Sequence, residues 1–230
     1  MTKHLPEAVS VAKVAAASIP FTSIVKRMLG PAADELAEMW QDQVRLYRYE
    51  RQLKCVEKAE RMAKEAGFTP QAVPPKILFP LLEGASFEEN EDLHTMWASL
   101  LANAAFPDQP DTVRPSFISI LRELAPDEAA VLKWMFDNSH YSPMFRNVRV
   151  SMNDLAAAFI GLGLSVKGDT LHGLNTIETE SRQRLETCID GLQAGQLIRR
   201  HDDPGADLYY KLTFRGRDCV LACRPPKPKE

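Results

Sequence analysis

Three groups of residues have the types and spacing from which metal or catalytic sites are built, and the first is Glu91 with His94. Together they form one Glu-x-x-His step. A di-iron helix bundle needs two such steps and two further glutamates. No other histidine in the chain has a glutamate three positions before it. We therefore predict that no metal ion is bound here.

The second group is a pair of cysteines, Cys219 and Cys223, which lie four positions apart and share one face of an expected helix. Two metal ligands would have this spacing. The remaining cysteines, Cys55 and Cys188, are isolated, so no second pair completes a metal site or a disulfide framework. We expect buried free thiols and a cytoplasmic protein.

The third group is Gly161-Leu162-Gly163, which lacks the third glycine and the preceding strand of a dinucleotide site. We expect these glycines to end a helix. No Gly-x-Ser-x-Gly, phosphate loop or His-Glu-x-x-His is present. We therefore predict no catalytic, cofactor-binding or metal-binding residues, no cofactor and no enzymatic activity. A pair of acidic residues that are distant in sequence stays open as an alternative.

Basic residues near the C-terminus raise the question of DNA binding. The candidates are Arg182, Arg184, Arg199 and Arg200. The whole chain holds 28 basic and 31 acidic residues, and residues 126–230 hold 14 of each. A protein with this balance forgoes most of the counterion release that supports DNA affinity. The sequence therefore favours a protein-binding or structural role for this region over DNA binding.

The elements that would position these residues begin with an amphipathic segment at residues 1–30. Its apolar residues recur at helical spacing up to Pro20, namely Leu5, Ala8, Val9, Ala12, Ala16 and Ile19. A membrane-surface helix has a comparable pattern but carries more lysine and arginine on its polar face. We expect the segment to pack on the body of the protein and predict no membrane partner.

A long helix is predicted over residues 31–66, with Pro31 at its start and Gly67 as its left-handed stop. At about 1.5 Å per residue it would measure about 54 Å, so it needs several partners along its length or a second copy of itself in a homo-oligomer. Its basic residues at a spacing of three wind around the helix, and glutamates lie four positions before several of them. We interpret them as a solvated, salt-bridged face.

Shorter helices are predicted over residues 76–84, 93–104 and 117–124. Pro80 predicts a kink or a break in the first of them. The second begins either with a capping box formed by Ser86 and Glu89 or with Asn90 as its cap. The three tryptophans, Trp40, Trp97 and Trp134, lie on apolar helical faces and are expected in the core.

Beyond Pro126 the predicted order is helix, short strand, helix, helix, hairpin and a last helix. Ser151 and Asp154 open the second helix of this series, and strands at 197–200 and 208–213 form the hairpin. This order resembles a winged-helix domain over residues 126–223. The predicted fold is thus mainly α, with an all-helical N-terminal domain followed by a small α+β winged-helix-like domain.

The central helices also carry a family resemblance. The motifs are Pro80-Leu81-Leu82-Glu83-Gly84-Ala85-Ser86, Met96-Trp97-Ala98-Ser99-Leu100-Leu101-Ala102-Asn103-Ala104 and Arg114-Pro115-Ser116-Phe117-Ile118, preceded by Leu29-Gly30-Pro31. Over about residues 29–136 the chain resembles the Abi-alpha family of bacterial proteins. The name refers to abortive infection, in which an infected bacterium halts growth or dies. The resemblance implies this setting and no particular catalytic residues.

The sequence therefore predicts four regions: residues 1–30 (amphipathic segment), 31–125 (helical Abi-alpha-like domain), 126–224 (winged-helix-like domain) and 225–230 (tail). We expect a non-enzymatic interaction or sensor protein in anti-phage defence that acts on host or phage protein partners. A winged-helix transcriptional regulator that uses the four arginines, and an infection-triggered toxic hydrolase or nuclease, are the alternatives.

Overall fold

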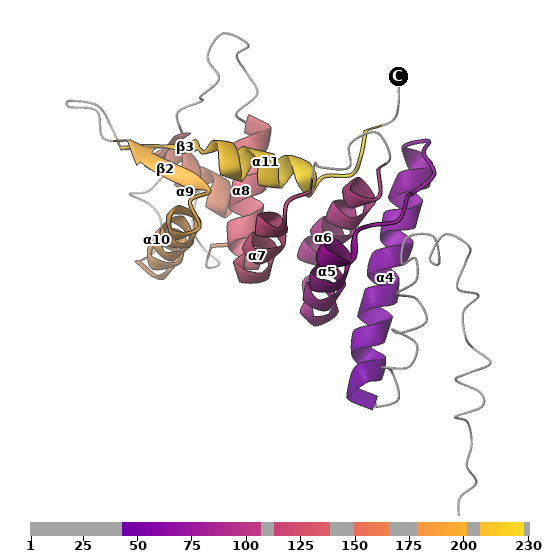
Figure 1. The fold of residues 1–230 in the computed structure, drawn as a ribbon. Helices are drawn as coiled ribbons and strands as arrows, with labels where there is room; N and C mark the ends of the chain where they lie inside the picture. Colours follow the sequence, from indigo (N-terminus) through magenta and orange to yellow (C-terminus); the bar gives the residue numbers. More distant parts are fainter. Residues whose placement is uncertain (1–42, 107–112, 139–149, 166–178, 202–207, 228–230) are drawn as a thin grey trace, which may run out of the picture.

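The helices are arranged in a row, and a small antiparallel sheet lies at the end of the row away from residues 43–65 (Figure 1). The computed structural model describes residues 43–106, 113–138, 150–165, 179–201 and 208–227. The elements are α4 (Gln43–Glu65), α5 (Pro75–Phe87), α6 (Glu91–Ala104), α7 (Pro115–Glu123), α8 (Pro126–Asn138), β1 (Val150–Ser151), α9 (Met152–Gly161), α10 (Thr179–Ala194), β2 (Ile198–His201), β3 (Tyr209–Leu212) and α11 (Phe214–Ala222). The predicted class, mainly helical with a small sheet near the C-terminus, is confirmed. Predictions for residues 1–42, including Trp40, and for the hairpin tip at 202–207 lie outside the described residues.

Local capping chemistry sets several helix ends. Gly67 has a φ of 76° and follows α4, as predicted for a left-handed stop. The Asn90 side chain accepts hydrogen bonds from the backbone nitrogens of Asp92 and Leu93, both at 3.0 Å, and caps α6. Ser86 instead lies in the last turn of α5 and donates to the Glu83 carbonyl at 2.6 Å. Of the two predicted caps, Asn90 is confirmed and Ser86 is wrong.

Pro80 does not break its helix, so of the two predicted outcomes the break is wrong. Helix α5 runs without interruption from Pro75 to Phe87. A proline removes one backbone donor from a helix and crowds the turn before it. Buried Leu78 precedes the proline, and buried Leu81 and Leu82 follow it. Packing of apolar side chains on both sides of the proline therefore holds the helix together across it.

Helices α4, α5 and α6 lie side by side (Figure 1). Contacts between α4 and α5 pair Arg48 with Ser86 and Gln52 with Leu82, so these two helices are antiparallel. In the contacts between α4 and α6, the residue numbers of both helices increase together. The pairs are Arg51 with Glu91, Lys58 with Thr95 and Met62 with Ser99. Helices α4 and α6 are consequently parallel, with α5 returning between them in the chain.

The C-terminal part has the predicted order of elements, α8-β1-α9-α10-β2-β3-α11. Its sheet has the strand order β1-β3-β2 and is antiparallel, with Val150 opposite Tyr210 and Ile198 opposite Leu212. The predicted Ser151–Asp154 capping box is present at the start of α9. Because β1 pairs with β3 and the capping box follows directly, α9 begins next to the sheet.

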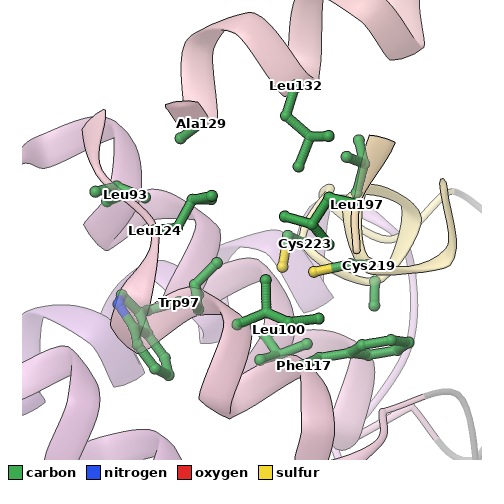
Figure 2. Packing of buried hydrophobic residues seen from close by; sticks show 14 of the residues in the cluster. Leu93, Trp97, Leu100, Phe117, Leu124, Ala129, Leu132, Leu197, Cys219 and Cys223 are labelled. Atoms are coloured by element: carbon green, nitrogen blue, oxygen red, sulfur yellow. The ribbon is translucent and has the colours of Figure 1, made fainter. Parts of the chain in front are cut away.

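One cluster of buried side chains extends from Cys55 in α4 to Cys223 after α11. Figure 2 shows Leu100 of α6, Leu132 of α8 and Cys219 of α11 converging in it. Trp97 is buried in this cluster, as predicted for a core residue, whereas Trp134 is only half-buried. The cluster includes residues from both sides of position 125, and the boundary between the two predicted domains remains a prediction.

Candidate functional site

A large groove lies between α6, α8 and the end of α11. Its volume is about 1430 Å³. The α6 side is formed by residues 92, 95, 96, 99 and 103, with Phe106 just beyond the helix, and the α8 side by residues 126, 129, 130, 133, 134, 137 and 138. Spacings of three and four place each set along one face of its helix. The groove is therefore an elongated channel between two helices.

Apolar side chains dominate this channel. Half-buried Met96 and Trp134 form part of its walls, and Leu162 and Leu221 lie at its edge with 41% and 43% of their surfaces exposed. Pro225 and Pro226 continue the apolar surface beyond α11. The predicted core position of Trp134 is therefore only partly correct, because this half-buried side chain packs against the core and also lines the groove. Exposed large apolar side chains gathered in one concave surface are typical of a site that binds another apolar surface.

The C-terminal wall of the groove is fixed to α6 and α8. The Asn103 side-chain nitrogen donates to the carbonyls of Ala222 and Arg224 at 2.8 and 2.7 Å. The Arg224 guanidinium forms an ion pair with Asp137 and lies 4.4 Å from the centroid of the Phe136 ring. These contacts join residues more than 80 positions apart, so they hold the tail as a wall of the groove.

Charges at the groove are few and unevenly placed. Lys133 and Lys227 are exposed, and within the described part of the chain neither forms an ion pair. Asp92, in the first turn of α6, is also exposed and has an unpaired carboxylate among the described residues. Asp137 is already paired with Arg224. A ligand would therefore meet two cations and, at the N-terminal end of α6, one anion.

Glu91 and His94 join α6 to α4. Lys58 reaches Glu91 Oε2 at 2.8 Å, Thr95 Oγ1 at 3.2 Å and His94 Nδ1 at 3.3 Å. Arg51 contacts Glu91 Oε1 at 2.7 Å and also donates to the Glu88 carbonyl. The sequence-based interpretation of these basic residues as a solvated face is wrong for Arg51 and Lys58, because both turn toward α6.

The pKa directions in this network follow from its contacts. Hydrogen bonds from Lys58 and Arg51 lower the pKa of Glu91 to about 2. Burial lowers the pKa of His94, which is fully buried, below its usual value of 6.5. A neutral His94 fits its surroundings, because Nε2–H can donate to the Arg51 carbonyl at 3.0 Å while Nδ1 accepts from Lys58. At neutral pH the contacts therefore favour an ionised Glu91 and a neutral His94. We interpret this network as a structural contact between α4 and α6.

The four arginines predicted for DNA binding are not brought together. Arg182 and Arg200 line one cleft of about 510 Å³ between α9, α10 and the sheet. Arg199 is the neighbour of Arg200 on β2, lies opposite Lys211 and points to the other face of the sheet. The Arg184 guanidinium lies 5.9 Å from the centroid of the Phe159 ring. Two of the four candidates therefore share a site.

That cleft is balanced in charge. Arg182 forms an ion pair with Glu186 at 3.0 Å, and Asp190 and Glu186 line the cleft together with the two arginines. Two cations and two carboxylates leave no excess positive charge to attract phosphates. The cleft therefore suits a ligand that carries both positive and negative groups.

The cysteines are buried free thiols, as predicted. Burial raises the pKa of Cys55 to about 12, and contact with Cys219 together with burial raises the pKa of Cys223 well above its usual value. Figure 2 shows the sulfur atoms of Cys219 and Cys223 next to each other in the core. Thiols of this kind are weak nucleophiles at neutral pH. Among the residues that the structure describes, no three histidine, cysteine or acidic side chains cluster as metal ligands would.

The groove was not found from the sequence. The signal was present in α8, where Ala130, Lys133, Trp134 and Asp137 recur at spacings of three and one beside a separate buried face. One face of α8 is buried in the core and a second face lines the groove, so the helix has two surfaces that other groups can contact. The partner wall in α6 lies about 30 positions earlier, so only the fold shows that the two faces meet.

Comparisons with known proteins place these observations in a family. None of the helices in the described residues has the length and apolar character needed to cross a membrane. No curated protein and no solved structure matches the chain. The family model described as abortive infection alpha matches residues 43–218. This match includes the C-terminal sheet and is longer than the resemblance over residues 29–136 on which the sequence-based prediction rests. The chain therefore belongs to the abortive infection alpha family.

Proposed function

We propose that this protein is a non-enzymatic interaction or sensor protein in anti-phage defence that acts through a protein partner. Its family indicates a role in abortive infection. The observation that supports a protein partner is the groove between α6 and α8, with its volume of about 1430 Å³. Small-molecule pockets usually measure about 300–1000 Å³. A long apolar channel of greater volume suits a polypeptide, bound as a helix in a groove.

The proposal can be tested by protection of bacterial cells against a broad phage panel. Leu162→Glu with Leu221→Glu places two charges at the edge of the groove, and both side chains are already partly exposed. Protection should be lost while the protein remains folded. Phe214→Glu is the matched control, because Phe214 is 81% exposed and does not line the groove.

Two results would contradict this proposal. The first is full protection by cells that carry the folded Leu162→Glu/Leu221→Glu protein, which would exclude the groove. The second is the absence of protection by the unaltered protein against every phage of the panel, which would exclude the defence role. A circular dichroism melting curve for each variant separates loss of binding from loss of folding.

DNA binding is the second candidate, because Arg182 and Arg200 face one cleft. A salt titration of DNA retardation decides between the two candidates. Binding whose salt dependence weakens in Arg182→Ala and Arg200→Ala proteins would favour a transcriptional regulator. Absence of retardation at low salt would exclude it.

Self-association through the long helix is a further part of the proposal. Leu46 and Tyr47 are exposed near the start of α4, whereas the exposed residues from Glu50 to Glu65 are charged. Contact between copies would therefore use the start of the helix. The mass in solution, measured by light scattering for the unaltered protein and for a Leu46→Ser/Tyr47→Ser protein, tests this.

A further inference from the structure

We infer that the groove between α6 and α8 binds a partner helix that is acidic at its N-terminal end and lies antiparallel to α6. The inference deepens the proposed function and rests on it in one respect, namely that the groove binds a polypeptide as a helix. It adds the charge pattern and the direction of that helix. Three observations support it: the relative direction of the two groove helices, the shape of the groove and the positions of its unpaired charges.

Helices α6 and α8 run in the same direction along the groove, and their C-terminal ends meet at Arg224. The Asn103 side chain, in the last turn of α6, donates to the Arg224 carbonyl at 2.7 Å. The Arg224 guanidinium pairs with Asp137, in the last turn of α8. The groove therefore has two different ends. One is formed by the first turns of both helices, and the other by their last turns together with residues 223–227.

The shape of the groove suits a helix with one apolar side. Ser99 of α6 and Ala129 of α8 line the groove although both are buried, so small side chains form its floor. Small residues on two neighbouring helices allow a third helix to approach closely. The larger side chains of Met96 and Trp134 form part of the walls. The groove residues at 92–106 extend over about 21 Å at about 1.5 Å per residue, which is the length of a helix of about 14 residues.

The unpaired charges of the described residues differ in sign between the two ends of the groove. Exposed Lys227 follows Arg224 at the C-terminal end, and exposed Lys133 lies one turn before Asp137. Asp92, in the first turn of α6, is exposed at the opposite end. Asp137 contributes little to this pattern, because its carboxylate is paired with Arg224. A ligand therefore meets positive charge at the last turns of the two helices and negative charge at the start of α6.

A partner helix matches these charges when its first turn is acidic and its last turn is basic. This distribution also stabilises a helix by itself, because it complements the helix dipole. In the antiparallel direction the acidic turn lies beside Lys133 and Lys227, and the basic turn lies beside Asp92. The dipole of the partner is then antiparallel to those of α6 and α8. The parallel direction would place like charges next to each other, and charges at the edge of an interface determine orientation more than affinity.

The first test measures the charge preference with synthetic peptides and the full-length protein. Each peptide is a helix of about 14 residues that is held by a hydrocarbon staple and has leucines along one side. One peptide carries glutamates in its first turn and lysines in its last turn, and the other carries glutamine at those positions. Fluorescence anisotropy should show about tenfold tighter binding of the charged peptide, because each exposed ion pair contributes a small amount. High salt should remove the difference.

Charge reversal in the protein identifies the groups that the peptide contacts. In a Lys133→Glu/Lys227→Glu protein the charged peptide should bind less tightly than the neutral one, because its glutamates would lie beside carboxylates. Lys54→Glu/Lys76→Glu is the matched control. Both of these lysines are exposed and neither lines the groove, so this protein should keep the preference of the unaltered one.

The second test determines the direction of the bound helix. A benzophenone amino acid in the first turn of the charged peptide should form photo-crosslinks to residues 223–227. The same group in the last turn of the peptide should form crosslinks to residues 92–95, at the start of α6. Mass spectrometry after digestion locates the crosslinked residues.

Several outcomes would overturn the inference. Equal affinity of the two peptides for the unaltered protein would exclude the charge pattern, and crosslinks exchanged between the two ends would exclude the direction. A mass in light scattering that falls on addition of the peptide would show that a second copy occupies the groove. Absence of binding by both peptides would overturn the inference together with the groove as a helix site.

These outcomes can be distinguished from failure of the proposed function. Equal binding of both peptides that is lost in the Leu162→Glu/Leu221→Glu protein would leave the groove as a helix site and contradict only the inference. The peptide assays require no phage, so the expected charge preference in a protein that gives no protection would contradict only the proposed function.

Discussion

Among single residues, Lys58 joins α4 to α6 through three polar contacts. Its ammonium group contacts a carboxylate, an imidazole and a hydroxyl, all of them in the first turns of α6. Arg48, Arg51, Cys55, Lys58 and Met62 recur at alternating spacings of three and four, so they share one face of α4. Three positions of this face are basic, and basic residues are more often solvated. Neighbouring helices can nevertheless satisfy such groups when they provide carboxylates and carbonyls.

The pH dependence of stability should report on His94. Its pKa is lower in the folded protein than the usual 6.5, so the unfolded chain takes up a proton first as the pH falls below about 6.5, and stability decreases. His94→Gln retains one donor and one acceptor but does not titrate. The urea midpoint should fall less between pH 7.5 and 5.5 in this variant than in the unaltered protein.

This pH range is separate from the one in which Glu91 titrates. Because the pKa of Glu91 is about 2 in the folded protein, its contribution to stability is lost only as the pH falls below about 4.5. Comparison with the unaltered protein at the same pH cancels the contributions of the other histidines. An equal fall in the urea midpoint for both proteins would show that His94 is not the group responsible.

A second prediction at this scale concerns Gly84, which lies against Trp97. A Cβ atom at position 84 would lie 2.7 Å from Trp97 Cζ2 and would press on the buried ring. We expect Gly84→Ala to lower the free energy of unfolding by about 1–3 kcal/mol, the usual cost of overpacking. Urea denaturation followed by tryptophan fluorescence measures it.

The matched control is Gly161→Ala, where a new Cβ atom would meet nothing within 4 Å. Its free energy of unfolding should stay close to that of the unaltered protein. If both variants were equally stable, the indole ring of Trp97 would have to move at little cost.

At the scale of elements, short-range chemistry determined most helix boundaries. Asn90 and Ser151 begin α6 and α9, and Gly67 follows α4. Each of these interactions joins residues within four positions of each other, so the sequence contains all of its parts. Pro80 shows the limit of this reasoning, because packing of leucines from α5 against other helices outweighs the missing backbone donor.

The cap of α6 gives a prediction at this scale. Asn90→Ala removes the acceptor for two backbone N–H groups and should destabilise the protein by about 1 kcal/mol. Asn90→Asp keeps an acceptor at the same position and should restore most of this loss. Thermal unfolding at neutral pH measures both variants. Equal melting temperatures for Asn90→Ala and the unaltered protein would contradict the assignment of the cap.

At the scale of the whole molecule, the C-terminus is attached to the central helices. Asn103 binds two carbonyls that lie 119 and 121 positions later, and Arg224 joins Asp137. These contacts close the core cluster between α6, α8 and α11, and they also form one wall of the groove. The attachment of the tail and the shape of the groove are therefore coupled.

Asn103→Ala should accordingly destabilise the protein by about 1–3 kcal/mol, because two carbonyls lose their donor. Hydrogen exchange should also increase at the end of α11 and in residues 223–227. Asn138→Ala is the control, since among the described residues its side chain donates to the Trp134 carbonyl of its own helix. Unchanged exchange in the Asn103→Ala protein would show that the tail is held mainly by Arg224.

The sequence by itself determined the elements, the buried thiols and the family. Helix caps, glycine stops and apolar periodicity act over a few residues, and for that reason they can be interpreted without the fold. Only the tertiary structure decided that Arg51 and Lys58 turn toward Glu91, that Arg182 and Arg200 share a cleft and that faces of α6 and α8 enclose a groove. Those arrangements depend on which distant segments pack together, because a polar or apolar face is buried or exposed according to its neighbours in space.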